Sequence, residues 1–210
     1  MKKEKTVSRL IKEYGIIIAL VLLSAFFGVM KPKFLTASNF LTILKQTSVV
    51  AICSVGMLFV LITAGINLSV GYMMAATGMT AAIFMVWYGM HPALAIILVF
   101  IIMMLVGVVI GWIVAYTNVV SFIVTLAFMN VLKGFSFLVT GGRNVADLPD
   151  SFCWLGTGSI AMIPVPVILM AVALLMGWII LKKMYVGRYF YAIGSNEEAA
   201  RLSGINVKLV

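Results

Sequence analysis

Six long apolar runs constrain this chain more than any other feature of its sequence. Each run comes close to the roughly 20 residues that an α-helix needs to cross a bilayer. The chain is 64% hydrophobic and only 10% charged, which exceeds what a soluble domain of this length needs to fill one core. We therefore predict an all-α, polytopic helical membrane protein with about six transmembrane helices, over residues 14–30, 43–66, 72–88, 93–117, 121–140 and 162–181.

The positive charges gather at the two ends of the chain, whose formal net charge is +9. This clustering argues against a nucleic-acid partner, because no basic face runs along the chain. The positive-inside rule instead places both ends in the cytoplasm, which fits six crossings. Residues 1–13 are then a cytoplasmic basic N-terminus, and residues 182–210 a cytoplasmic segment followed by the start of a further span. Lys31, Lys33 and Lys45 fall around an outer loop, so one apparent span could instead be re-entrant.

A polar break interrupts the apolar sequence between the second and third predicted spans. Gly65 and Gly71 bracket Asn67 and Ser69 there, and regular helix is expected to stop. Asn67 or Ser69 can cap the helix that follows, which is a purely structural role. A helix that starts inside a transporter also directs backbone donors at a cavity, where they contact solute or shape a gate. On that interpretation the break residues, together with Thr77 in the next span, belong to a candidate solute path.

The fifth predicted span carries Asn130, Lys133 and Thr140 at spacings that place them along one helical face. Lys133 is the one basic residue deep within a predicted span. Charge inside a membrane is costly and usually faces protein or water, so Asn130 and Lys133 join the candidate solute path. The alternative is that Lys133 reaches outward to the interface, because Gly141 lies only about 12 Å further along the helix.

The segment after the last span predicts a short helix with defined ends. Ser195 and Glu198 have the spacing of a capping box, Arg201 suits a helix end, and Gly204 can stop the helix. A helix of about two turns is unstable alone in water, so another surface must support it. That surface is either the protein's own cytoplasmic face or a partner.

Catalytic signatures are not found. The sequence has no P-loop for ATP, and its single histidine, His91, has no acidic or cysteine cluster around it. We predict a protein that is not an enzyme, with no cofactor and no metal site.

Four ordered stretches resemble one known family: residues 62–71, 122–126, 140–142 and 187–205. The chain looks like a sugar-type ABC importer permease of the group that carries ribose, galactose, xylose and furanosyl autoinducers. The resemblance implies a multi-pass subunit of the bacterial inner membrane that transports a ribose-like monosaccharide. It also implies three partners: cytoplasmic ATPase subunits, a second permease copy and an extracytoplasmic solute-binding protein.

The same resemblance makes the short cytoplasmic helix the element that contacts the ATPase. The residues implied in this coupling are Gly187, Arg188, Gly194, Ser195, Asn196, Glu197, Glu198, Ala199, Ala200, Arg201 and Gly204.

Two departures from the family pattern matter. Relatives usually carry Asp where this chain has Asn67, which removes a charge from the break. The chain also stops at Val210, where relatives continue through further spans, so a C-terminally truncated permease is expected. Two rival interpretations stay open: a secondary transporter or channel subunit driven by an ion gradient, and a nonfunctional truncated permease.

Overall fold

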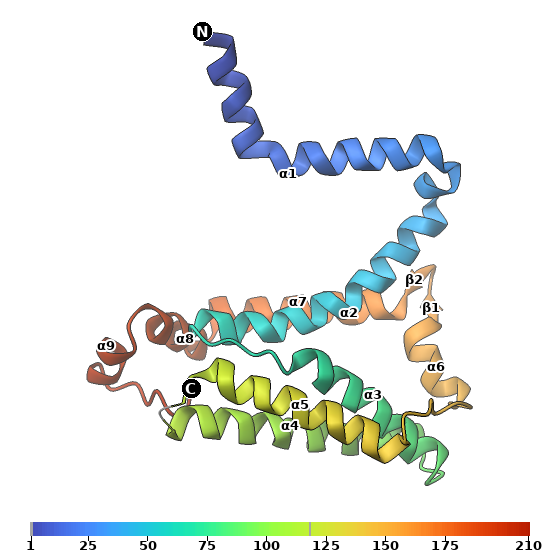
Figure 1. Ribbon diagram of the computed structural model, residues 1–210, viewed down its shortest axis with the longest axis vertical. Coiled ribbons are helices and arrows are strands. Elements are labelled where there is room, and N and C mark those ends of the chain that lie inside the picture. The colour runs from blue at the N-terminus through green and yellow to red at the C-terminus, as the bar shows by residue number, and fades with distance from the viewer. Residues whose placement is uncertain (1, 118) are drawn as a thin grey trace. The chain divides into compact units, whose positions relative to one another are not determined.

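The computed structural model describes the backbone from Lys2 to Val210 except Asn118, and the side chains from Tyr14 onward except that of Asn118. The described part is built from helices and one two-stranded sheet (Figure 1), which confirms the predicted all-α class. By contacts the chain divides into two compact units, Met1–Thr47 and Ser48–Val210. The elements are α1 (Lys2–Met30), η1 (Pro32–Leu35), α2 (Ala37–Ile62), α3 (Val70–Val86), α4 (Pro92–Tyr116), α5 (Ser121–Thr140), α6 (Asp150–Thr157), β1 (Ser159–Ile160), β2 (Ile163–Pro164), α7 (Val165–Lys183), α8 (Tyr185–Ser195) and α9 (Glu197–Leu202).

Among the described residues, four helices are long and apolar enough to cross a membrane: α2, α4, α5 and α7. The described part of α1, Tyr14–Met30, and α3 are apolar but shorter. Helix α2 ends at Ile62, four residues before the predicted end of the second span at residue 66. The side chains of the predicted basic N-terminus, residues 1–13, lie outside the described residues. The six crossings therefore stay a prediction. Four of the six predicted spans correspond to a helix long enough to cross a membrane.

The first unit is organised around the turn that follows α1. Pro32 opens η1, a position where its missing N–H and fixed φ suit a helix start. The rings of Phe27 and Phe34 lie 5.8 Å apart, and the Asn39 side-chain amide donates to the Phe34 carbonyl at 2.8 Å. These contacts tie the first turn of α2 to η1.

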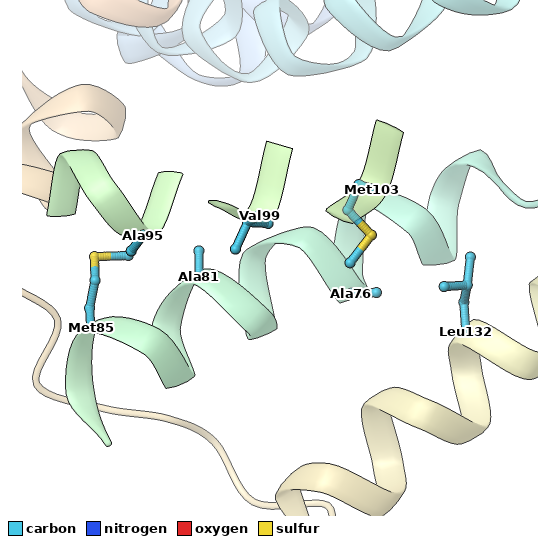
Figure 2. Packing of buried hydrophobic residues seen from close by; sticks show 7 residues of the cluster. All are labelled: Ala76, Ala81, Met85, Ala95, Val99, Met103 and Leu132. Atoms are coloured by element: carbon cyan, nitrogen blue, oxygen red, sulfur yellow. The ribbon is translucent and has the colours of Figure 1, made fainter. Parts of the chain in front are cut away.

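The core of the second unit lies where α3 packs between α4 and α5. Ala76 and Ala81 on α3 meet Val99 and Met103 on α4, and Leu132 of α5 closes the cluster (Figure 2). Small side chains on α3 let the neighbouring backbones approach closely, as in helix pairs inside membranes.

Residues 141–164 connect α5 to α7 at the end of the unit opposite α8. Gly141 ends α5 in the left-handed conformation, with φ of 61°. After α6, strands β1 and β2 pair antiparallel through Ser159 with Pro164 and Ile160 with Ile163. Ala161 and Met162 at the turn have φ of 47° and 71°, the backbone of a two-residue hairpin turn that usually selects Gly or Asn.

Candidate functional site

The structure has the predicted break between the second and third spans. Backbone hydrogen bonds end α2 at the start of this break. The Gly65 N–H donates to the Val60 carbonyl at 2.9 Å, and the Ala64 N–H donates to the Leu61 carbonyl at 3.0 Å. Ala64 has φ of 60°, so these bonds form a Schellman motif with alanine at the position that usually holds glycine. Residues 63–69, here called the linking segment, then lead to α3.

Asn67 organises the end of the linking segment. Its side-chain oxygen accepts from the Ser69 backbone N–H at 2.9 Å and from the Ser69 hydroxyl at 2.6 Å. Ser69 is fully buried and takes the N-cap position of α3, but its side chain makes no capping bond. The expectation that Asn67 or Ser69 accepts from the first turn of α3 is therefore wrong. The Asn67 oxygen accepts instead from the N–H of Ser69, the residue before that turn, and so closes an Asx turn.

Two hydroxyls at the start of α5 hold the middle of the linking segment. The Ile66 N–H donates to the Ser121 hydroxyl at 3.1 Å, and the Thr125 hydroxyl donates to the Ile66 carbonyl at 3.2 Å. Thr125 is only 3% exposed. Both backbone groups of Ile66 are thus satisfied outside any helix, as non-helical backbone within a membrane protein requires. We did not predict these contacts from the sequence; the signal was two hydroxyl residues four positions apart on one face of an apolar helix.

Helix α8 packs against the end of α2, immediately before the linking segment. A Cβ at Gly194 would collide with the Ile62 carbonyl oxygen, so only glycine fits there. The rings of Phe59 and Phe190 lie 5.6 Å apart and extend this contact. Gly187 also lies close to backbone, because a Cβ there would collide with the carbonyl oxygens of Leu181 and Ile180 near the end of α7. Glycine at both positions lets α8 lie directly on the ends of two apolar helices.

An open groove of about 870 Å³ runs along α3 and α5 to the segment that follows α5. Its polar lining residues are Asn130, Lys133, Ser136, Thr140, Arg143 and Asn144. The Lys133 ammonium lies 5.9 Å from the centre of the Tyr72 ring, beside the first turn of α3. The alternative that Lys133 reaches outward to the interface stays a prediction.

The groove brings together only part of the predicted solute path. Asn130 and Lys133 line it, with Thr140 of the same helical face. The break residues Gly65, Asn67, Ser69 and Gly71 do not line it, nor does Thr77. The Thr77 hydroxyl donates to the Met73 carbonyl at 2.7 Å within its own helix.

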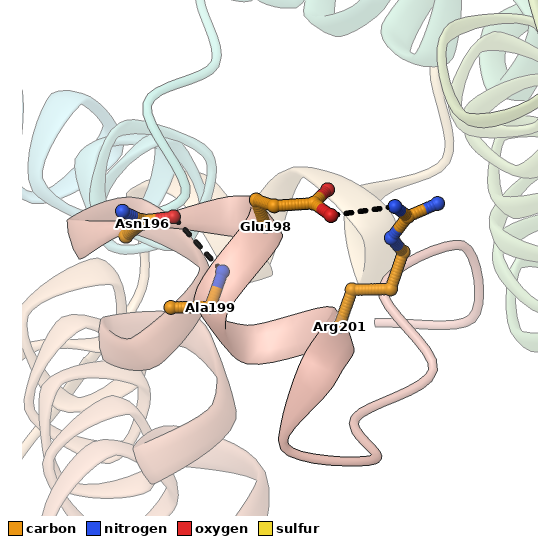
Figure 3. A network of polar contacts seen from close by, with 4 residues as sticks. All are labelled: Asn196, Glu198, Ala199 and Arg201. Atoms are coloured by element: carbon orange, nitrogen blue, oxygen red, sulfur yellow. Dashed lines mark hydrogen bonds and ion pairs between the residues drawn. The ribbon is translucent and has the colours of Figure 1, made fainter.

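Helix α9 begins at a different cap from the one predicted. The Asn196 side-chain oxygen accepts from the Ala199 N–H at 2.9 Å (Figure 3), so Asn196 is the N-cap. Ser195 cannot serve, because it is the last residue of α8, a helix that we did not predict. The capping-box interpretation of Ser195 and Glu198 is therefore wrong.

The far end of α9 follows the prediction. Glu198 pairs with Arg201 at 2.6 Å, also visible in Figure 3. The hydrogen bond and the charge of Glu198 raise the pKa of Arg201 above its usual value. Gly204 follows with φ of +84°, a backbone that suits glycine after a helix end.

The two capping assignments predict different results for two alanine substitutions. Asn196→Ala removes the acceptor of the Ala199 N–H and is expected to destabilise α9 by about 1 kcal/mol. Ser195→Ala removes a hydroxyl that caps nothing and should leave α9 unchanged. Hydrogen exchange of the Ala199 and Ala200 amides measures both. Faster exchange in Ser195→Ala than in Asn196→Ala would contradict the structural assignment.

Comparison with known proteins places this chain in a family. The family described as "Branched-chain amino acid transport system / permease component" matches residues 39–210. The ribose import permease protein RbsC of Haemophilus influenzae is 42% identical over all of this chain and 67% of its own length. The RbsC protein of Escherichia coli is 40% identical over 92% of this chain and 61% of its own length. The xylose transport system permease protein XylH of H. influenzae is 31% identical over 99% of this chain and 72% of its own length. No solved structure matches.

The chain therefore belongs to this family of transport-system permease components, and it is a multi-pass membrane protein. The predicted resemblance to ribose and xylose permeases is confirmed. The chain spans about two thirds of the length of the ribose permeases that it matches.

Proposed function

We propose that this chain is a membrane-spanning permease subunit of an ATP-driven importer that carries a monosaccharide across the bacterial inner membrane. The observation that carries the proposal is the groove along α3 and α5, in a chain 42% identical to a ribose import permease. Hydroxyl and amide side chains in the groove can exchange hydrogen bonds with sugar hydroxyls, and Tyr72 offers an aromatic surface.

The charge in the groove supports a path shared with another subunit. Lys133 is exposed on an apolar span helix, and exposure of an ammonium to hydrocarbon would be costly. A second permease copy against α3 and α5 would turn the open groove into an enclosed, water-accessible path. We propose that an extracytoplasmic binding protein delivers the solute to this path.

We propose that α8 and α9 form the contact with cytoplasmic ATPase subunits, which would put the C-terminal segment in the cytoplasm. With an even number of crossings, the basic N-terminus would lie there too. Glu197 and Glu198 are exposed at the start of α9, and Leu202 is 79% exposed at its end. A single exposed apolar side chain is common on protein surfaces, so this part of the proposal is carried by the resemblance to ribose import permeases. Ala200 is buried on the inner side of α9, and the remaining coupling residues from Gly187 to Gly204 belong to the same proposed surface or support it.

The test is uptake of labelled sugar by vesicles that contain the assembled transporter. We expect ribose uptake that requires ATP and the binding protein, with xylose and allose as competitors that rank specificity. Unaltered uptake after ATP is withdrawn, combined with loss when proton and sodium gradients are collapsed, would reject the proposal in favour of a secondary transporter.

A further inference from the structure

We propose that Ser121 and Thr125 are positioning residues that connect the ATPase-facing helices to the solute groove through the linking segment. The inference rests on the proposed function and concerns how movement of α8 and α9 reaches α5. No single contact makes the connection. It is a continuous path through Gly194, the end of α2, Ile66 and the start of α5.

The path starts where α8 lies on α2. Because Gly194 packs against the Ile62 carbonyl with no room for a Cβ, α8 cannot slide along α2 without moving it. The Phe59 and Phe190 rings hold the same two helices one turn away. Tightly packed surfaces of this kind transmit displacement because they do not compress. A displacement of α8 therefore reaches Ile62, the last residue of α2.

The linking segment is held at its start by a hydrogen bond to α2 and at its end by hydrogen bonds within itself. The Schellman motif fixes its start through the Gly65 N–H, and the Asn67 turn onto Ser69 fixes its end. Ile66 lies between these two fixed turns. A segment whose N–H groups at Gly65, Ile66 and Ser69 are all bonded transmits a displacement instead of absorbing it as a flexible loop would.

Ser121 and Thr125 pass the displacement to α5. They hold the two backbone groups of Ile66, one by accepting and one by donating, so a shift of Ile66 pulls on α5. The Thr125 hydroxyl also lies 3.3 Å from the Phe122 carbonyl of its own helix. The groove residues Asn130 and Lys133 follow Thr125 on the same helix. Lys133 is eight residues on, about 12 Å along a helix. Movement at the start of α5 thereby repositions the charged part of the groove.

The experiment measures how much ribose the assembled transporter carries for each ATP hydrolysed. We expect Thr125→Val to lower this ratio about fivefold, the factor that loss of one ordinary hydrogen bond produces. Basal ATP hydrolysis and complex assembly should stay unchanged, and Thr125→Ser, which restores the hydroxyl, should restore the ratio. Ser121→Ala should lower the ratio in the same direction.

Two matched controls have hydroxyls that bond only within their own helices. The Thr157 hydroxyl donates to the Cys153 carbonyl, and the Ser54 hydroxyl donates to the Val50 carbonyl. Thr157→Val and Ser54→Ala should leave the ratio unchanged. A ratio that stays constant in Thr125→Val, or that falls equally in Thr157→Val, overturns the inference.

Hydrogen exchange separates this inference from the proposed function. The Ile66 amide of the purified protein should exchange faster in Ser121→Ala than in the unaltered chain, whether or not transport is measured. Absence of ATP-driven uptake by the unaltered complex would reject the proposed function alone. Unchanged Ile66 exchange in Ser121→Ala would reject the positioning role alone.

Discussion

Gly194→Ala is expected to detach α8 from α2. The added methyl group would meet the Ile62 carbonyl oxygen, which is backbone and cannot rotate away as a side chain can. Overpacking of this kind costs about 3 kcal/mol, and more where backbone must move. For a chain of this length we expect the midpoint of thermal unfolding in detergent to fall by about 10 °C. In the assembled transporter, ATP hydrolysis should continue while uptake falls.

Gly56→Ala is the control for the Gly194 prediction. Gly56 lies on α2, the helix that Gly194 contacts, and a Cβ there meets nothing within 4 Å. Alanine also favours a helix interior over glycine by about 1 kcal/mol. The midpoint should therefore stay constant or rise slightly. Equal midpoints for Gly194→Ala and the unaltered protein would show that α8 does not lie on α2 as described.

Lys133→Gln is expected to lower uptake about tenfold, which corresponds to only ~1.4 kcal/mol in the transport barrier. The substitution keeps a polar side chain of similar length and removes the one charge within α5. It also removes the contact with the Tyr72 ring, which depends on a full positive charge. Lys133→Arg keeps both the charge and the ring contact and should retain most of the uptake.

Lys183→Gln controls for the general effect of losing a cation beside an aromatic ring. The Lys183 ammonium lies 5.8 Å from the centre of the Trp178 ring, close to the geometry at Lys133, but at the end of α7 and outside the groove lining. Uptake should stay within about twofold, as for most surface substitutions. If both glutamine variants lose uptake equally, Lys133 has no special role in the groove.

The elements that follow from local chemistry were predictable from the sequence. Apolar length alone predicts residues 121–140 as a helix, and α5 has these bounds. The two glycines around Asn67 predict the break, and Gly204 predicts the end of α9. Asn130, Lys133 and Thr140 were placed on one face by spacing alone, and all three line the groove. Each of these features depends on residues within a few turns of one another.

The features that we missed depend on contacts between distant parts of the chain. Ser121 and Thr125 looked like ordinary residues of an apolar helix until Ile66 was placed beside them. Helix α8 was missed because part of its support comes from α2, more than 120 residues earlier in the sequence, in addition to its packing on α7 and α9. The missed helix also explains why Ser195 was wrongly predicted as the N-cap of α9. Ser195 is the last residue of α8, so the cap is the next residue, Asn196. The hairpin turn at Ala161 and Met162 was not predicted, because it lacks the Gly or Asn that usually indicates such a turn.

The Asn67 turn has a consequence for the conditions in which the break keeps its shape. The side-chain oxygen of Asn67 accepts both hydrogen bonds from Ser69, and an aspartate at this position would accept the same two. A carboxylate inside a membrane protein can take up a proton, and its pKa responds to every nearby charge. An amide has no proton to gain at physiological pH. The link between α2 and α3 in this chain is therefore held by a group whose bonding is the same in acidic and neutral surroundings.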